Sequence, residues 1–241
     1  MMPAMSPPSP PVRALVFDVF GTLVDWHGSI TREVRQWLGH RVADPAAFAT
    51  EWRARYQPAM QRVRSGEIPF CKLDVLHRLN LDDVLAARGL ESVDEAMRVE
   101  LNLAWHRLDA WPDVAAGLRR LRERFRIAPC SNGHIGLMVD LARHNALPWD
   151  AILGAELARD YKPQPAVYLS AASAFDCAPA EVLMVAAHSD DLAAAAACGL
   201  RTAHIARPDE HGSGIGERAP RIAVDWRAQD LLDLATQLGA P

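Results

Sequence analysis

Five short apolar runs, separated by segments with helical periodicity, constrain the fold of this chain more than any other feature. Each run is apolar on both faces and is bounded by polar or turn-forming residues. Such runs are typical of strands in a parallel sheet that is covered on both sides. The runs are Ala14–Asp18, Ile127–Ser131, Ala151–Gly154, Val182–Ala187 and Thr202–Ala206.

Helical patterns lie between several of these runs. Apolar residues recur at three- and four-residue spacing in Asp113–Phe125 and in Ile135–His144. The alanine-rich segment Asp190–Cys198 precedes Gly199, a residue that commonly ends a helix. Strands that alternate with helices predict an α/β fold with a doubly wound parallel sheet.

One long stretch interrupts this alternation. Residues 28–105 carry helical periodicity and no convincing strand. We therefore expect a helical cap domain at 28–105, inserted into a core domain formed by 12–27 and 106–241. Residues 1–11 contain five prolines and two serines, a composition that predicts a disordered tail.

Composition excludes several classes of function. The 26 lysines and arginines stand against 30 acidic residues, a net charge of −4, and no basic run indicates nucleic-acid binding. No apolar run approaches the roughly 18–20 residues that span a bilayer, so we expect no membrane association. The four cysteines are widely spaced and no export signal precedes them, which argues against a structural zinc site or a disulfide framework. These features predict a cytoplasmic protein.

Polar side chains follow four of the predicted strands. Asp18 ends the first run with Thr22 close behind it, Ser131–Gly133 ends the second, Lys162 follows the third, and His188 to Asp191 follow the fourth. The carboxyl ends of parallel strands share one edge of a sheet, where ligands bind. Each residue alone has an ordinary interpretation as a helix cap, a turn or a surface group. Their convergence at one edge instead predicts an active site.

The same residues carry a family resemblance. The segments DVFGTLVDW (Asp18–Trp26), SNG (Ser131–Gly133) and YKPQPAVY (Tyr161–Tyr168), together with the acidic segment after the fourth run, resemble the haloacid dehalogenase superfamily over nearly the whole chain after the tail. The segment Trp52–Tyr56 resembles the type II subgroup, the (S)-2-haloacid dehalogenases. This resemblance implies a Rossmann-like core with an inserted helical cap, and a homodimer.

Two positions favour dehalogenation over phosphoryl transfer. Phosphatases of the superfamily usually carry an aspartate general acid where this chain has Phe20, and a magnesium ligand where it has Ala187. Halide leaves without a proton and a monoanionic substrate needs no divalent cation, so we expect neither a cofactor nor a metal. A Mg²⁺-dependent phosphatase or other small-molecule hydrolase is the alternative, and an inactive α/β binding protein is a third.

The resemblance implies a role for each catalytic residue. Asp18 attacks the substrate Cα with inversion, which gives an aspartyl ester and then, from a short (S)-2-haloalkanoic acid, an (R)-2-hydroxy acid. Lys162 keeps Asp18 ionised, Arg53 receives the halide ion, and Asp191 activates the water that cleaves the ester.

Further residues are implied as binding groups. Thr22, Ser131 and Asn132 position Asp18 or the substrate carboxylate, and Tyr168 joins the Lys162 network. The apolar walls are assigned to Phe20, Trp52 and Tyr56.

The chain departs from better-known type II enzymes, which have Ser and Asn where it has Ala186 and His188. His188 is interpreted either as a replacement for that Asn, holding the water or Asp191, or as a base. This departure leaves open whether the enzyme prefers to release fluoride, chloride or bromide, and the sequence does not name the natural substrate.

His134 is interpreted as a residue at the start of a helix rather than as a site residue, and Gly212–Gly216 as a flexible loop.

Overall fold

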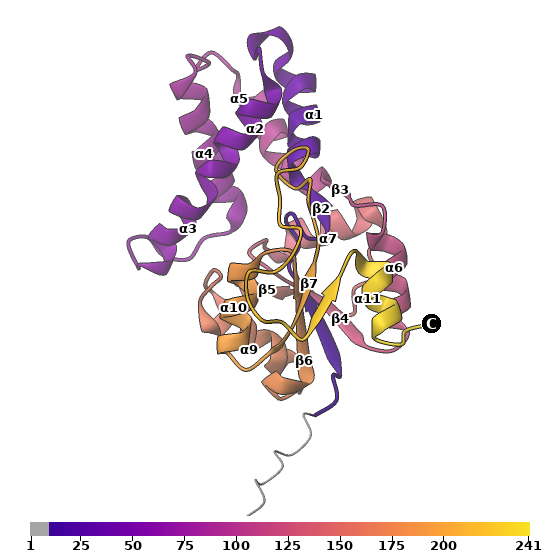
Figure 1. Cartoon of the computed structure of the whole chain (residues 1–241). Helices are drawn as coiled ribbons and strands as arrows, with labels where there is room; N and C mark the ends of the chain where they lie inside the picture. The colour runs from indigo at the N-terminus through magenta and orange to yellow at the C-terminus, as the bar shows by residue number, and fades with distance from the viewer. Residues whose placement is uncertain (1–9) are drawn as a thin grey trace, which may run out of the picture.

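A central parallel sheet organises the molecule (Figure 1). The structure is a computed structural model and describes residues 10–241, so most of the predicted tail at 1–11 lies outside the described residues. The six strands follow the order β5-β4-β1-β6-β7-β8, and every neighbouring pair is parallel. Their bounds are β1 Ala14–Phe17, β4 Arg126–Ser131, β5 Leu153–Gly154, β6 Val182–Ala186, β7 Arg201–Ile205 and β8 Trp226–Ala228.

The strand prediction is confirmed for all five apolar runs, with small differences at the ends. Strand β5 contains only Leu153 and Gly154 of the predicted run Ala151–Gly154. Strand β8, Trp226–Ala228, was not predicted, because only its last residue is buried and its sequence shows no apolar run. An edge strand that is half exposed lacks the pattern on which the prediction depended.

Helices cover both faces of the sheet, which confirms the doubly wound fold. Leu15 and Phe17 of β1 belong to the apolar core with α6, α7 and α11, whereas Ala14 and Val16 pack into a second core with α9 and α10. The strand alternates between the two cores because successive side chains point to opposite faces. The helices of this part are α6 Val114–Arg122, α7 Ile135–Asn145, α8 Ala155–Ala158, α9 Pro165–Ala174, the 3-10 helix η3 Pro179–Glu181, α10 Ser189–Ala197 and α11 Leu231–Gln237.

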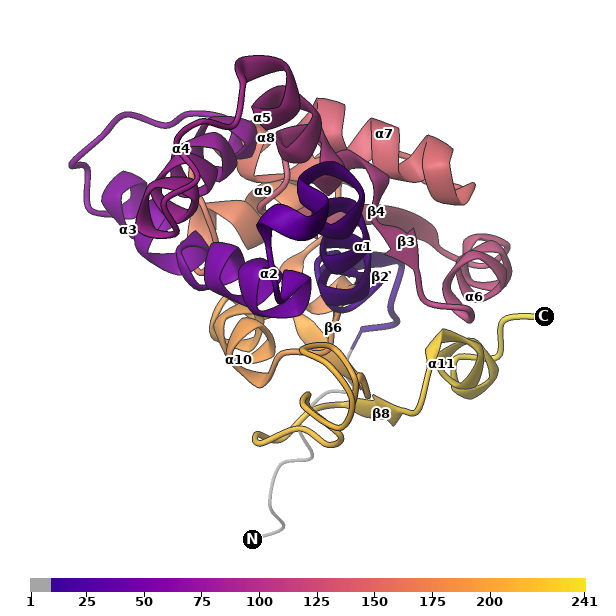
Figure 2. The ribbon, with the colours of Figure 1, turned by 90° about the horizontal axis from the view of Figure 1, so that it is seen from above.

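A group of helices stands over the carboxyl edge of the sheet (Figures 1 and 2). A small antiparallel pair links it to the sheet: β2 (Val24–Asp25) pairs with β3 (Asp109–Ala110), so the chain enters and leaves through one hinge. These strands are too short to show a periodicity, and the sequence did not predict them. The helices are α1 Trp26–Leu38, η1 Gly39–Arg41, α2 Pro45–Ala54, α3 Tyr56–Arg64, α4 Leu73–Ala87, α5 Glu95–Asn102 and η2 Leu103–Arg107.

Among residues 10–241, no helix combines the length and the apolar character that crossing a bilayer requires.

Gly154 holds β5 against the segment that carries the SNG motif. Its φ is +122°, and a Cβ there would lie 2.7 Å from Ser131 N and closer still to Ser131 O. We expect Gly154→Ala to lower the free energy of unfolding by about 2 kcal/mol or more, because backbone atoms must move apart as well as accept a strained φ. Urea unfolding measures this loss.

The matched control is Gly89→Ala. Gly89 also has a positive φ, but its missing Cβ would meet no atom within 4 Å, so only the backbone strain of about 1 kcal/mol applies. Equal losses in the two variants would contradict the steric explanation.

Candidate active site

Asp18 lies directly after β1, at the carboxyl edge of the sheet. Its backbone N–H donates to Val185 O at 3.0 Å, which fixes the start of the loop against β6. The Thr22 hydroxyl donates to Asp18 Oδ2 at 2.7 Å and accepts the N–H of Ala187 at 2.9 Å. Because the Thr22 oxygen accepts this hydrogen bond from the backbone, its own hydroxyl hydrogen is free to point at Asp18. The carboxylate is therefore held in one orientation.

Lys162 joins two carboxylates. Its Nζ lies 3.1 Å from Asp18 Oδ1 and 2.7 Å from Asp191 Oδ2, and its backbone N–H donates to Asn132 Oδ1 at 2.8 Å. Burial alone would raise the pKa of Asp18, but Lys162, His188 and Thr22 together hold it well below its ordinary value. Burial alone would lower the pKa of Lys162, and the two carboxylates raise it instead. Asp18 and Lys162 are therefore a buried ion pair at neutral pH.

Asp191 lies in the first turn of α10 and has a different environment. The Tyr168 hydroxyl donates to its Oδ1 at 2.6 Å, and Lys162 holds its Oδ2. Burial, and then the negative charge of Asp18, raise its pKa despite the contact with Lys162. The two carboxylates that share the Lys162 ammonium therefore have different pKa values, and Asp191 is the more basic of the two.

His188 lies between Asp18 and one further carboxylate, that of Glu210. Its Nδ1 is 3.2 Å from Asp18 Oδ2, and its Nε2 is 2.8 Å from Glu210 Oε2. Burial alone would lower the pKa of His188, but hydrogen bonds and charge from Asp18 and Glu210 raise it to about 10. The ring is therefore an imidazolium at neutral pH. An imidazolium has no free lone pair, so this geometry argues against the base role considered for His188. It also directs the ring to Asp18, not to Asp191.

Glu210 is the functional residue that our sequence reasoning missed. It lies in the loop after β7, is almost fully buried, and also accepts the Trp26 indole N–H at 3.2 Å. A Cβ at Gly21 would overlap its carboxylate, so the glycine of the DVFGT segment makes room for it. The other polar residues of the site follow the first four predicted strands. Glu210 follows the fifth, so the same rule for the edge of a parallel sheet, extended to this strand, would have indicated it.

Arg53 projects from α2 into a ring of aromatic side chains. Its guanidinium carbon lies 3.9 Å from the centroid of the Tyr56 ring, 5.3 Å from that of Trp26 and 5.7 Å from that of Phe20. The Nη1 atom is buried and has no hydrogen-bond partner in residues 10–241. A cation held by aromatic faces, with a free donor, is suited to a small anion.

A cavity of about 650 Å³ lies between α2 and α3 on one side and the sheet edge on the other. Of the predicted site residues it exposes Asp18, Phe20, Arg53, Tyr56, Asn132, Lys162, Tyr168, His188 and Asp191.

Three predicted site residues lie behind the cavity wall. The Trp52 indole donates to His77 O at 2.9 Å and packs edge-on against Trp105, so it supports the cap interior rather than forming a wall. Ser131 Oγ accepts the N–H of Gly133 at 3.1 Å and shapes the turn. Thr22 acts through Asp18 alone.

Comparison with known proteins gives concordant matches. The haloacid dehalogenase-like hydrolase family matches residues 12–199. The (S)-2-haloacid dehalogenase 1 of Pseudomonas sp. (strain CBS-3) is 30% identical over 203 residues, 82% of this chain and 86% of that protein.

Two crystal structures are similar over almost the whole length. One is a defluorinating L-2-haloacid dehalogenase, with a TM-score of 0.92 and 44% identity over 95% of this chain and 96% of that chain. The other is an L-2-haloacid dehalogenase, with a TM-score of 0.89 and 45% identity over 95% of this chain and 100% of that chain.

The charge of His188 depends on Glu210. We expect Glu210→Gln to lower the His188 pKa from about 10 by roughly 1 unit or more, because one of its two anionic partners is lost. The stability that this charge contributes is fully present below the ordinary pKa of 6.5 and is lost as pH rises through about 10. In the variant that loss moves to lower pH. NMR titration of the imidazole resonances measures the pKa.

Asp209→Asn is the control, since Asp209 is an exposed carboxylate in the same loop. An unchanged His188 pKa in Glu210→Gln would show that Glu210 does not hold the imidazolium.

Proposed function

Because the chain belongs to the haloacid dehalogenase-like hydrolases, we propose that it hydrolyses short (S)-2-haloalkanoic acids to (R)-2-hydroxy acids through an ester on Asp18. One observation carries this proposal. A carboxylate held anionic by Lys162 and His188 opens onto the same cavity as Arg53, a cation whose Nη1 has no hydrogen-bond partner among residues 10–241. The cavity thus offers a nucleophile and a receptor for the departing anion.

The first step is a displacement at carbon. An Asp18 oxygen forms a bond to Cα while the carbon–halogen bond breaks, and its electron pair leaves with the halide. Attack from the side opposite the halide inverts the (S) centre. The halide is a weak base and takes no proton, so Phe20 supplies an apolar wall where an acid would serve no purpose. The guanidinium of Arg53 receives the halide ion.

Ester formation removes the negative charge of Asp18 and leaves Lys162 and His188 in place. Lys162 Nζ and His188 Nδ1 then both point at an ester group and can stabilise the oxyanion that forms when water attacks Asp18 Cγ. Their geometry is already set in the free site, so little reorganisation is needed.

Asp191 is the base for that water. Burial and Asp18 raise its pKa, which favours proton uptake, and each of its oxygens keeps a lone pair beside its present donor. Asp191 takes a proton from water and returns it to the alkoxide oxygen of the departing 2-hydroxy acid. Asp18 then loses its remaining proton to solvent, so halide and one proton are the net by-products.

Asn132 is the residue best placed for the substrate carboxylate. It lines the cavity and its Oδ1 accepts the Lys162 backbone N–H, which leaves its amide N–H groups to donate. Thr22 and Ser131 do not line the cavity.

The two protein cations beside Asp18, Lys162 and His188, support a reaction that is independent of Mg²⁺. We further propose that the protein is located in the cytoplasm and forms a homodimer.

Removal of Arg53 tests the halide receptor. We expect Arg53→Ala to lower the turnover of (S)-2-chloropropionate at least about 10²-fold, the usual effect of losing one charge-stabilising donor. Halide release at saturating substrate measures this, and a thermal unfolding scan confirms that the variant is folded.

Arg55→Ala is the matched control. Arg55 lies just beyond α2 but pairs with Glu51 and does not line the cavity, so its loss should change turnover only a few-fold. Near-normal turnover in a folded Arg53→Ala protein would remove Arg53 from the mechanism.

An oxygen-labelling experiment tests the ester. In a single turnover in H₂¹⁸O with enzyme in excess, the hydroxyl oxygen of the product comes from Asp18 and the solvent label enters its carboxylate. We therefore expect unlabelled 2-hydroxy acid and ¹⁸O in the peptide that contains Asp18, measured by mass spectrometry. Label in the product and none in the peptide would make Asp18 a base that activates water, not a nucleophile.

A further inference from the structure

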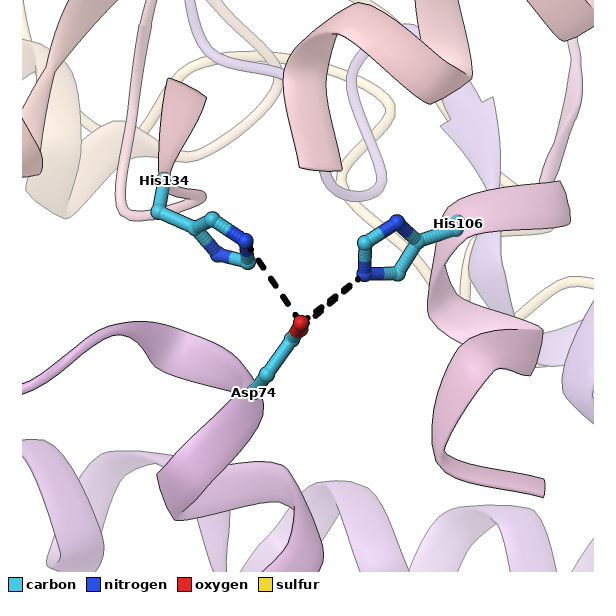
Figure 3. A group of neighbouring side chains, drawn as sticks. All are labelled: Asp74, His106 and His134. Carbon is cyan, nitrogen blue, oxygen red and sulfur yellow. Dashed lines mark hydrogen bonds and ion pairs between the residues drawn. The ribbon is translucent and has the colours of Figure 1, made fainter. Parts of the chain in front are cut away.

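Three potential metal ligands meet at the junction of the helical cap and the sheet domain (Figure 3). Asp74 lies in the first turn of α4, His106 in η2 close to the hinge, and His134 immediately before α7. None of them lines the active-site cavity or has a part in the proposed reaction. We interpreted His134 from the sequence as a residue at a helix start. The structure confirms that position and adds the two partners.

The donor atoms converge on one point. His106 Nε2 lies 3.1 Å from both oxygens of Asp74, and His134 Nε2 lies 3.5 Å from Asp74 Oδ2. All three ligand atoms are within 4.8 Å of one another. Ligands about 2.0–2.1 Å from a first-row metal stand roughly 3–3.5 Å apart in tetrahedral or octahedral geometry. Small rotations of the side chains therefore place the three atoms around one ion.

Asp140 of α7 orients one of the histidines. Its Oδ2 lies 2.7 Å from His106 Nδ1, so that nitrogen donates to Asp140, and the Nε2 atom becomes available to an ion once the ion replaces the hydrogen bond from Nε2 to Asp74. A carboxylate behind a histidine in this way is the usual support of a metal-binding imidazole. It is an observation independent of the three ligands themselves.

Burial also favours an ion. The side chains of His106 and His134 are almost fully buried, whereas Asp74 is partly exposed and leaves a route from solvent. Asp74 and Asp140 place two carboxylate groups beside the two histidines.

We propose that Asp74, His106 and His134 bind one divalent transition-metal cation, such as Zn²⁺, and that this ion fastens the helical cap to the sheet domain. Two imidazole nitrogens and one carboxylate oxygen select zinc or a neighbouring late transition metal over Mg²⁺ or Ca²⁺, which prefer oxygen ligands. The remaining coordination positions are left to water. The site is structural and lies outside the chemistry proposed for Asp18.

The consequence is a coupling between metal and cap docking. The ligands come from three separate segments, so the ion binds only when α4 and η2 rest on the start of α7. An ion that binds only this arrangement stabilises it by mass action. At a Zn²⁺ concentration about 100-fold above its Kd, we expect the thermal midpoint to rise by roughly 5–10 °C.

Isothermal titration of the full chain with ZnCl₂, after stripping with EDTA and dialysis, tests the proposal. We expect one Zn²⁺ per chain in wild type, and loss of that binding by more than about 100-fold in the His106→Ala/His134→Ala double variant. Asp140→Asn should weaken binding about 10- to 100-fold through His106. Asp74→Asn keeps the size of the side chain and gives a second ligand variant if the double variant does not fold.

His144→Ala is the matched control, because His144 lies on α7 but pairs with Asp109 instead. It should retain both the 1:1 binding and the rise in thermal midpoint. Equal binding in wild type and the ligand variants, or no Zn²⁺ binding by wild type below about 1 mM, would overturn the proposal. Halide release by wild type in EDTA is measured separately, so failure of the dehalogenase proposal remains distinguishable from failure of the metal site.

Discussion

The hydrogen bonds from one buried ammonium to two carboxylates are the interaction on which the site depends. Without Lys162, Asp18 and Asp191 would be two buried anions at close range, and one of them would take up a proton. With it, Asp18 stays ionised while Asp191 keeps a raised pKa. The sheet makes this possible, because it brings the ends of β1 and β6 and the turn before α9 to the same edge.

A second ion pair, between Glu210 and His188, also places a positive charge beside Asp18. Glu210 holds His188 as a cation, and His188 in turn contacts Asp18 on the oxygen that Lys162 leaves free. Asp18 is therefore flanked by protein cations on both oxygens. A site with this balance of charge suits a monoanionic substrate and a departing halide.

The helical cap contributes to the site through packing as much as through charge. Trp52 and Trp105 form part of the buried aromatic layer beneath Phe20, and this layer fixes α2 so that Arg53 faces Asp18 across the cavity. The cap reaches the sheet through the β2–β3 hinge, through the bond from Arg64 to Lys162 O at 2.8 Å, and through the cluster of Asp74, His106 and His134. The orientation of Arg53 thus also depends on contacts of the cap that lie outside the cavity, at the β2–β3 hinge and at this cluster.

The doubly wound sheet and much of the candidate site could be predicted from the sequence, because apolar runs indicate burial on both faces and the residues that follow parallel strands share one edge of the sheet. Asp18, Lys162 and Asp191 were identified in this way. The β2–β3 hinge and β8 were not, since a two-residue strand and a half-exposed edge strand carry no periodic signal. Glu210 was not identified either, because it lies in the loop after β7, beyond the residues that directly follow the strand, although it obeys the same sheet-edge rule. The charge of His188 and the position of Trp52 behind the cavity wall became clear only from the fold. A pKa and a packing direction depend on neighbours distant in sequence, which no local pattern encodes.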